Sequence, residues 1–447
     1  MKRNFFNTKW LLSAVLLAGT TLVSKAQNVR SITAKEAVQL SLQNNKQLKI
    51  AKARIDEATA NVQEAEDRRL PEASATAMYI LLKTPGVDLK IKTGSDSSGS
   101  KPSSSHSFSS VAVTMVNASL PIYAGGQIKY GIESARYLAE ARNLDAEYDK
   151  SGVVQNTLNA CRNLFKASQT VSLVQENLKQ EQERVKQFTN LEKNGLLARN
   201  DLLKASLQTS NVELALLEAQ NNLNIANVNM DLMLGLPETT KLEIDTTGFK
   251  VTFDNKGLAE WEQLAFDNRK DIASLQQQKK ATDANLKAIN GERMPTVALT
   301  GGYISAYLQN IATITNAINL GVTAKYSIST LWKNKAKMTK AKAQQDQLVY
   351  TQEMLDENIR MEITKAYEDY FLLQKKIEVY GRAIEQADEN YKITKNKYNN
   401  GLATLTELLD ADLAELRAKL NQSLARADVA LAYVQLQKSA GVLTQNF

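Results

Sequence analysis

Residues 36–46 read EAVQLSLQNNK, and residues 260–270 read EWEQLAFDNRK. The match continues without a gap to residues 80 and 304, at a constant offset of 224 positions (36 to 260). A second match, at an offset of 206 (195 to 401), relates Asn194-Gly195-Leu196 to Asn400-Gly401-Leu402. The chain is therefore one long unit written twice, and such a duplication indicates a pseudo-symmetric architecture.

The first 26 residues have the three parts of a secretory signal peptide. Lys2, Arg3 and Lys9 form a charged region, an apolar stretch follows, and Ser24-Lys25-Ala26 is a small-residue cleavage site. A membrane anchor is the alternative, but the apolar stretch is short and contains small and polar residues. We expect cleavage of residues 1–26. The mature chain would then consist of a first repeat, a linker and a second repeat, over residues 27–236, 237–256 and 257–447.

The charge balance and the rare residue types exclude several function classes. The leader holds four of the 55 basic residues and none of the 48 acidic ones, so the mature chain is near +3 (51 against 48). That balance does not indicate nucleic-acid binding. Cys161 and His106 are each the single residue of their type, which excludes an internal disulfide, most His-based catalysis and most zinc sites. We expect Cys161 to pack in a helix, and we expect no catalytic, cofactor or metal site.

Helical periodicity extends over much of the chain. Thr33-Ala34-Lys35-Glu36 has the pattern of a capping box and predicts a helix that runs to about Leu70. Residues 127–194 predict a helix of 68 residues, roughly 100 Å long at 1.5 Å per residue. From Ile363 to Tyr398, apolar and small residues recur at spacings of three and four, which indicates a left-handed coiled coil. An extended structural rod is the alternative explanation for these helices.

Each repeat also contains two stretches with a period of two, which is typical of β-strands. They predict strands at about 74–82, 110–121, 296–308 and 317–328, and residues 83–109, rich in Ser and Gly, predict an exposed loop. After the leader no apolar run of about 18 residues occurs, so a membrane could be spanned only by a closed barrel. Known single-chain barrels have at least about eight strands, so several copies would have to contribute. Two small soluble hairpins packed on helices are the alternative.

From about Ser31 to Val442 the chain resembles the TolC family of outer-membrane efflux ducts. The resemblance rests on the duplication, on the junction LPIYAGG at 120–126 and on the hairpin YNNGLATLTELLDA at 398–411. It implies a mainly α-helical chain whose long antiparallel coiled-coil helices form a periplasmic tunnel. Its four membrane strands would join those of two further copies in a homotrimer with a 12-stranded barrel. The implied location is the outer membrane of a diderm bacterium.

The resemblance also implies partners. A periplasmic adaptor (membrane fusion) protein and an inner-membrane pump of the RND, ABC or MFS type would work with the duct. The sequence has neither a nucleotide-binding loop nor a membrane helix bundle, so the pump would supply the energy.

Roles at two helix tips follow from the same resemblance. Gly195 and Gly401 would form the tip turns at the periplasmic entrance. Glu407 and Asp410, three residues apart on one helix face, would form two rings of three carboxylates that constrict the pore. A solvated helix face is the alternative explanation for both acids.

A latch at the tips is implied as well. Tyr398 corresponds to the family's gating tyrosine, and Asp201 to the aspartate that it binds on the other tip. Tyr398 is also the last residue of the heptad seam, so packing would explain it too. Well-known members have a latch arginine where this sequence has Ala403, and Arg199 in the facing tip is a candidate substitute. The sequence therefore does not determine how the entrance is held shut.

The sequence predicts a passive outer-membrane duct of a tripartite efflux system or a type I secretion system. A periplasmic coiled-coil adaptor or rod is the alternative, although an adaptor would need a globular domain beside one hairpin rather than a full-length duplication. An enzyme has no support beyond scattered acids. The sequence does not specify the exported substrate, whether small molecule or protein.

Overall fold

The computed structural model describes residues 29–446 except 82, 84–109, 246–255 and 309–311. The expected signal peptide, nearly all of the expected 83–109 loop and half of the expected linker lie outside the described residues. The chain divides into two compact units, which we call the tip unit and the strand unit. The tip unit comprises residues 1–46, 150–261 and 362–447, and the strand unit comprises residues 47–149 and 262–361. Each unit combines segments of both repeats.

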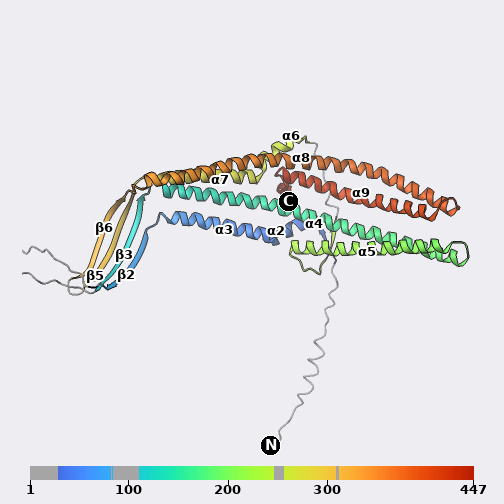
Figure 1. Cartoon of the computed structure of the whole chain (residues 1–447), viewed down its shortest axis with the longest axis horizontal. Helices are drawn as coiled ribbons and strands as arrows, with labels where there is room; N and C mark the ends of the chain where they lie inside the picture. The colour runs from blue at the N-terminus through green and yellow to red at the C-terminus, as the bar shows by residue number, and fades with distance from the viewer. Residues whose placement is uncertain (1–28, 82, 84–109, 246–255, 309–311, 447) are drawn as a thin grey trace, which may run out of the picture. The chain divides into compact units, whose positions relative to one another are not determined.

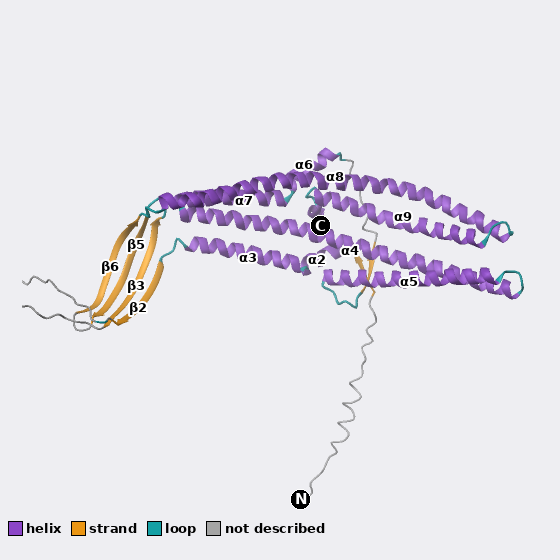
Figure 2. Cartoon of the chain, in the orientation of Figure 1, coloured by secondary structure: helices purple, strands orange, loops and turns teal. Residues whose placement is uncertain are grey.

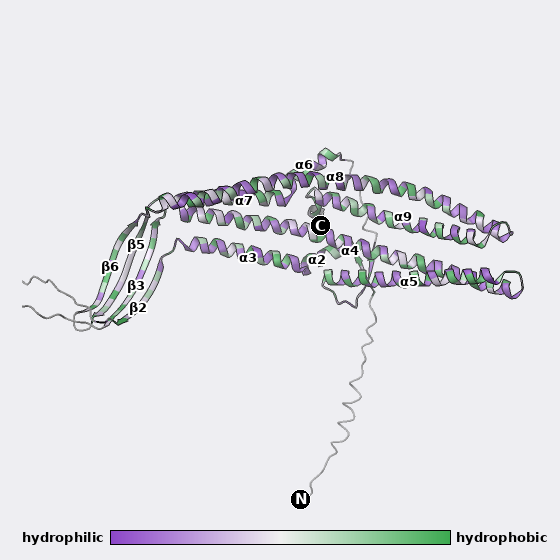
Figure 3. Cartoon of the chain, in the orientation of Figure 1, coloured by the Kyte–Doolittle hydropathy of each residue, from purple (hydrophilic) through white to green (hydrophobic). Residues whose placement is uncertain are grey.

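The strand unit contains a four-stranded antiparallel sheet in the order β2-β3-β5-β6. Its strands are β2 (Glu72–Leu81), β3 (Ser110–Tyr123), β5 (Thr296–Leu308) and β6 (Ala312–Lys325). They lie side by side in Figures 1 and 2, and hydrophobic and hydrophilic residues alternate along them in Figure 3. All four strands that the period of two predicts are present, and β2 and β6 form the two edges of the sheet.

Strand β6 begins five residues earlier than the sequence predicts, at Ala312 instead of about 317. Asn316 has a φ of 57°, and the pairing register with β5 shifts between Ile304 and Ala306. An asparagine in the left-handed region beside such an irregularity is typical of a β-bulge. The bulge interrupts the alternation of side chains, so this part of the strand reads as a loop in the sequence.

The turn from β3 into α4 (Gln127–Lys193) explains the glycines of the LPIYAGG junction. Gly125 and Gly126 have φ angles of 60° and 85°, which glycine adopts without steric cost. A Cβ added to Gly125 would lie 2.4 Å from the carbonyl oxygen of Gly291, the last residue of α7 (Lys270–Gly291). The junction therefore needs glycine both for its backbone angles and for its close contact with α7.

The tip unit has a small core that the sequence did not predict. Strand β1 (Val29–Thr33) pairs in parallel with β4 (Lys241–Asp245), which lies in the expected linker. Beneath this pair is a cluster of buried residues. Its members are Ile32, Ala37, Ala160, Cys161, Leu164, Met230, Leu234 and Leu242. The single cysteine packs in a helix as expected, and burial raises the pKa of its thiol to about 12.

The predicted helix from Thr33 to about Leu70 is wrong in one respect, because it is two helices. They are α2 (Ala34–Asn44) and α3 (Lys46–Asp67), separated at Asn45, whose ψ is 126°. The Thr33 side chain accepts a hydrogen bond from the Glu36 backbone N–H at 3.2 Å. The Glu36 carboxylate instead pairs with Arg30 at 2.6 Å, so only half of the predicted capping box forms.

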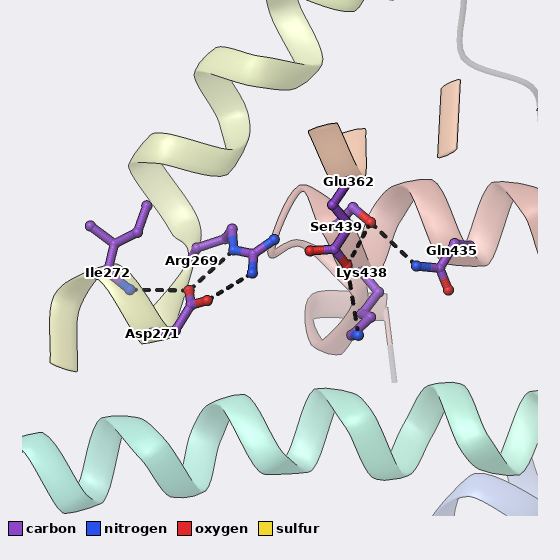
Figure 4. Close-up of polar contacts among 7 residues, drawn as sticks. All are labelled: Arg269, Asp271, Ile272, Glu362, Gln435, Lys438 and Ser439. Carbon is purple, nitrogen blue, oxygen red and sulfur yellow. Dashed lines mark hydrogen bonds and ion pairs between the residues drawn. The ribbon is translucent and has the colours of Figure 1, made fainter. Parts of the chain in front are cut away.

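The second repeat is interrupted at the equivalent place. Helices α6 (Leu258–Asn268) and α7 are separated at Arg269, whose ψ of 125° is close to that of Asn45. Arg269 donates two hydrogen bonds to Asp271, from Nε at 3.1 Å and from Nη2 at 2.7 Å (Figure 4).

Figure 4 also shows a polar contact within the tip unit, where Ser439 donates to Glu362 at 3.2 Å.

The long helices agree closely with the sequence. Helix α4 has 67 residues, and α8 (Thr330–Asn399) has 70. Each turns back into a shorter helix of the tip unit, α5 (Arg199–Leu234) after α4 and α9 (Leu405–Ser439) after α8 (Figure 1). Every predicted seam position from Ile363 to Tyr398 is buried or half-buried, which confirms the predicted seam. Among the described residues, no helix is long and apolar enough to cross a membrane.

Candidate functional site

The two helix tips have the same backbone design. In the first tip, between α4 and α5, Gly195 has a φ of 70°, and the Leu196 N–H donates to the Leu191 carbonyl at 2.8 Å. In the second tip, between α8 and α9, Gly401 has a φ of 72°, and the Leu402 N–H donates to the Lys397 carbonyl at 2.8 Å. A left-handed glycine with this hydrogen bond ends a helix as a Schellman motif. Both predicted glycines therefore lie at the tip turns.

The tips are held together by a small apolar cluster. Phe188, Ala205 and Leu405 are its buried members. Tyr398 is half-buried against it, with its ring centroid 6.0 Å from that of Phe188. The sequence offered packing as the alternative role of Tyr398, and the ring does pack.

The two residues of the proposed latch have no direct bond, but the charge of one acts on the other. In the described part of the chain, no hydrogen bond joins the Tyr398 hydroxyl to Asp201, and the nearest cation to the Asp201 carboxylate is Lys204 at 3.8 Å. Burial raises the pKa of the Tyr398 hydroxyl, the negative charge of Asp201 raises it further, and Arg184 opposes both. The two residues therefore interact electrostatically within one chain.

Glu407 has a local role that the sequence reading overlooked. Its carboxylate accepts hydrogen bonds from the Thr404 N–H at 2.6 Å and hydroxyl at 2.9 Å, while the Glu407 N–H donates to the Thr404 hydroxyl at 3.3 Å. This is a complete capping box. The bonds from Thr404 lower the pKa of Glu407, so the side chain stays ionised. Asp410 is exposed on the same helix.

The candidate substitute for the missing latch arginine makes a different contact. Ala403 is half-buried at the second tip. The Arg199 guanidinium lies 3.6 Å from Glu192, a residue of its own hairpin, and is largely exposed. Within one chain, Arg199 therefore does not bridge the two tips.

A buried charged cluster lies behind the tips, and the sequence reading missed it. The Arg184 guanidinium donates to Glu181 on the same helix at 2.7 Å and lies 3.5 Å from Asp412 on α9. Asn177 also donates to Asp412, at 3.4 Å. Burial raises the pKa of Glu181 to about 7, Asp412 adds to the increase and Arg184 opposes it. We call Asn177, Glu181, Arg184 and Asp412 the buried charge cluster.

A sequence signal for this cluster existed. The seam on α4 runs through Val174, Leu178, Val185 and Phe188 at spacings of four, seven and three. Glu181 falls at the omitted seam position, three residues after Leu178 and four before Val185. A carboxylate at a core position of a coiled coil is costly unless it has a partner. The position of Glu181 therefore indicated that its carboxylate has a buried polar or charged partner, but it did not identify that residue.

Comparison with known families decides what kind of protein has these tips. A model of the family described as outer membrane efflux protein matches residues 37–236 and 261–442, which are most of the two repeats. The chain belongs to the outer membrane efflux protein family. No curated protein sequence matches the chain.

Solved structures show that this efflux protein has the fold of known outer-membrane channels. CmeC from Campylobacter jejuni aligns with 92% of this chain and 86% of its own, at a TM-score of 0.77 and 17% identity. VceC from Vibrio cholerae aligns with 91% and 96%, at 0.73 and 17%. The open state of MtrE from Neisseria gonorrhoeae aligns with 92% and 89%, at 0.71 and 17%.

Family and fold together confirm the predicted TolC-like class. The chain is an outer-membrane efflux duct, located in the outer membrane with its helical tunnel in the periplasm. Both the family and the fold are those of channel proteins.

Proposed function

We propose that three copies of this chain assemble and that their twelve strands close one barrel. The observation that carries this proposal is the pair of free sheet edges. Among the described strands, β2 and β6 each have a neighbour on one side only, and an edge exposes unpaired backbone N–H and C=O groups. In lipid each unpaired group costs several kcal/mol, so an efflux duct with four strands per chain needs edges from further copies.

Exposed apolar side chains on the helices support the same assembly. On α5, leucines and one isoleucine are each more than half exposed at spacings close to multiples of a helical turn: Leu203, Leu207, Leu214, Leu217, Ile225 and Leu232. On the part of α8 in the tip unit, Leu372, Val379 and Ile393 recur at seven and fourteen residues and are also exposed. Such stripes are typical of coiled-coil faces that another helix covers. A neighbouring copy would cover them.

We further propose that the duct receives its cargo from an inner-membrane pump through a periplasmic adaptor. The family assignment supports this arrangement, and the sequence contains no motif that could use ATP. The pump could be of the RND, ABC or MFS type, and the cargo could be small molecules or, in type I secretion, protein. The sequence and fold support these alternatives equally.

At the entrance, we propose that Glu407 and Asp410 form negative rings. The capping box supports a fixed, ionised Glu407, and Asp410 is exposed one helical turn further along α9. Carboxylates around a narrow mouth focus a negative potential and attract cations. The alternative is that Glu407 serves only to cap α9.

Tyr398 and Asp201 are the proposed latch of the resting duct. The electrostatic effect of Asp201 on the Tyr398 hydroxyl within one chain supports the pairing. Tyr398→Phe keeps the ring on Phe188 and removes only the hydroxyl, so it should raise conductance in planar bilayers and sensitise cells to large antibiotics. Wild-type conductance in both Tyr398→Phe and Asp201→Ala would mean that helix packing alone closes the duct.

Assembly is tested by native mass spectrometry of the detergent-extracted protein. We expect a trimer that fractionates with the outer membrane and resists extraction by salt. A monodisperse monomer that retains its β-sheet signal would contradict the shared barrel. Release by salt would favour the alternative of a periplasmic adaptor or rod.

A further inference from the structure

The buried charge cluster joins the two helical hairpins of the tip unit behind their tips. Glu181 and Arg184 belong to α4, and Asp412 belongs to α9. Their side chains are only 1%, 10% and 6% exposed. The contact between Arg184 and Asp412 is therefore a buried ionic link between the hairpin of the first tip and the hairpin of the second.

The cluster is not balanced in charge. With both acids ionised, two negative groups face one guanidinium, and the Glu181 Oε2 atom has no hydrogen-bond partner among the described residues. Arg184 is closer to Glu181, at 2.7 Å, than to Asp412, at 3.5 Å. The acid on the same helix thus competes with the acid on the facing helix for one cation.

A proton on Glu181 would remove this competition. The protonated carboxyl is neutral and can donate a hydrogen bond to Asp412, which leaves the Arg184 guanidinium to pair with Asp412. The cluster would then have no net charge, and Asn177, Glu181 and Arg184 of α4 would all contact Asp412 of α9. When Glu181 is ionised, its repulsion of Asp412 favours separation of the two helices.

We propose that the buried charge cluster is a proton-sensitive clamp that holds the entrance shut, and that Glu181 is its switch. This inference rests on the proposed duct function. Position 403, where a latch arginine would link the hairpins, holds alanine. The clamp links the hairpins instead, through the buried Arg184 of α4 and not through an exposed arginine at the tip. Arg184 also acts on the Tyr398 hydroxyl, so the clamp is electrostatically connected to the tip.

The direction of the pH effect follows from linkage. With the cluster assembled, the pKa of Glu181 is about 7, so this state binds the proton more tightly than an open state in which the carboxyl meets water. Rising pH therefore favours opening between the two pKa values and has no further effect above the higher one. The charged groups that act on Glu181 are Arg184 and Asp412. Asn177 contacts Asp412, and Arg184 acts on Tyr398. The pKa of Glu407 nearby is lowered, so Glu407 stays ionised through this window.

The test is the open probability of the trimer in planar bilayers as a function of pH. For the wild type we expect an increase of up to about tenfold per pH unit between about pH 5 and 7, then a plateau. Glu181→Gln mimics the protonated acid and should keep the low open probability of the wild type at pH 5 across the range. Asp412→Asn leaves Glu181 alone with Arg184, so its pH step should move to lower pH.

Glu183→Gln is the matched control. Glu183 lies two residues away on the same helix, 3.8 Å from Lys186 and largely exposed, so this variant should keep the wild-type pH profile. A wild type with no pH step, or Glu181→Gln with an unchanged step, would overturn the proposal.

Amide hydrogen exchange of the wild-type protein is a second test, which requires no substitution and no channel recording. In the wild type, residues 177–188 and 405–415 should lose protection as pH rises to about 7, after correction for the intrinsic exchange rate. Protection that falls in this way in a chain that conducts nothing would support the clamp and contradict the duct. A conducting chain whose protection and open probability ignore pH would contradict the clamp and support the duct.

Discussion

The two helix tips share a backbone turn but differ at each of the five positions that follow it, 197–201 in the first tip and 403–407 in the second. At the offset of 206 positions, Thr404 and Glu407 of the second tip correspond to Ala198 and Asp201 of the first. The second tip therefore has a capping box, whereas Ala198 makes no side-chain capping bond. Leu405 is buried, while its counterpart Arg199 is exposed. Duplication has preserved the turn, but only the second tip has a capping box and a buried side chain at the first position of its helix.

This difference suggests that one tip moves more readily than the other. The first turn of an uncapped helix has unpaired N–H groups and opens easily. We therefore expect the beginning of α5 to open more readily than the beginning of α9. The second tip, with its cap and buried leucine, would be the fixed part on which the acids and Tyr398 are displayed. The first tip would be the part that moves.

The largest expected effect comes from breaking the link behind both tips. Arg184→Ala leaves two buried acids without their cation, and removal of one partner of a buried pair costs about 3–5 kcal/mol. Hydrogen exchange of residues 177–188 and 405–415 should then lose most of its protection in both hairpins. Lys186→Ala, which removes an exposed partner of Glu183, is the control and should leave exchange unchanged. Equal protection in the two variants would mean that the ionic contact of Arg184 does not hold the hairpins together.

The second effect tests whether the second tip is anchored by its leucine. Leu405 is 4% exposed, and a buried Leu→Ala substitution costs about 2–5 kcal/mol. Leu405→Ala should therefore release the beginning of α9 and unpack Phe188 and Tyr398. Arg199→Ala at the equivalent position of the first tip should change stability by no more than about 0.5 kcal/mol. Thermal unfolding of both variants measures the contrast, and similar losses at the two positions would remove the distinction between the tips.

The smallest effect concerns the caps. Thr404→Ala removes the capping residue of α9 and should cost about 1 kcal/mol, whereas Ala198→Ser supplies one to α5 and should gain a similar amount. Exchange at the first turn of each helix should become faster in the first variant and slower in the second. If Ala198→Ser changes nothing, the beginning of α5 is held by contacts other than its cap, and the proposed mobility of the first tip is wrong.

Much of the fold could be predicted because its signals are local. The seam from Ile363 to Tyr398 and the alternation in the strands are properties of neighbouring residues, so the sequence contains them in full. The break at Asn45 was missed because no proline or glycine marks it. The pairing of Val29–Thr33 with Lys241–Asp245 was missed because it joins two short segments far apart in the chain.

The candidate site was predicted less completely, for a similar reason. The tip glycines followed from the motif, whereas the latch between Tyr398 and Asp201 that the resemblance implies stays a prediction. Thr404 and Glu407 have the spacing of a capping box, but the resemblance implied a role in the pore for Glu407, and the cap was not predicted. Glu181 stood at a seam position, yet its partner Asp412 lies 231 residues later (412 minus 181). Only the packing of α4 against α9 identifies such a partner.

Cation selectivity in planar bilayers tests most directly whether the second tip forms the constricted entrance of the duct. The variant to record is Glu407→Gln with Asp410→Asn, because glutamine at this position can retain the capping box. Glu389→Gln, an exposed acid of α8, is the control. We expect the double variant to lose cation preference and block by multivalent cations, while the control keeps both. Unchanged selectivity and block in the double variant would contradict it, and would place these acids outside the pore.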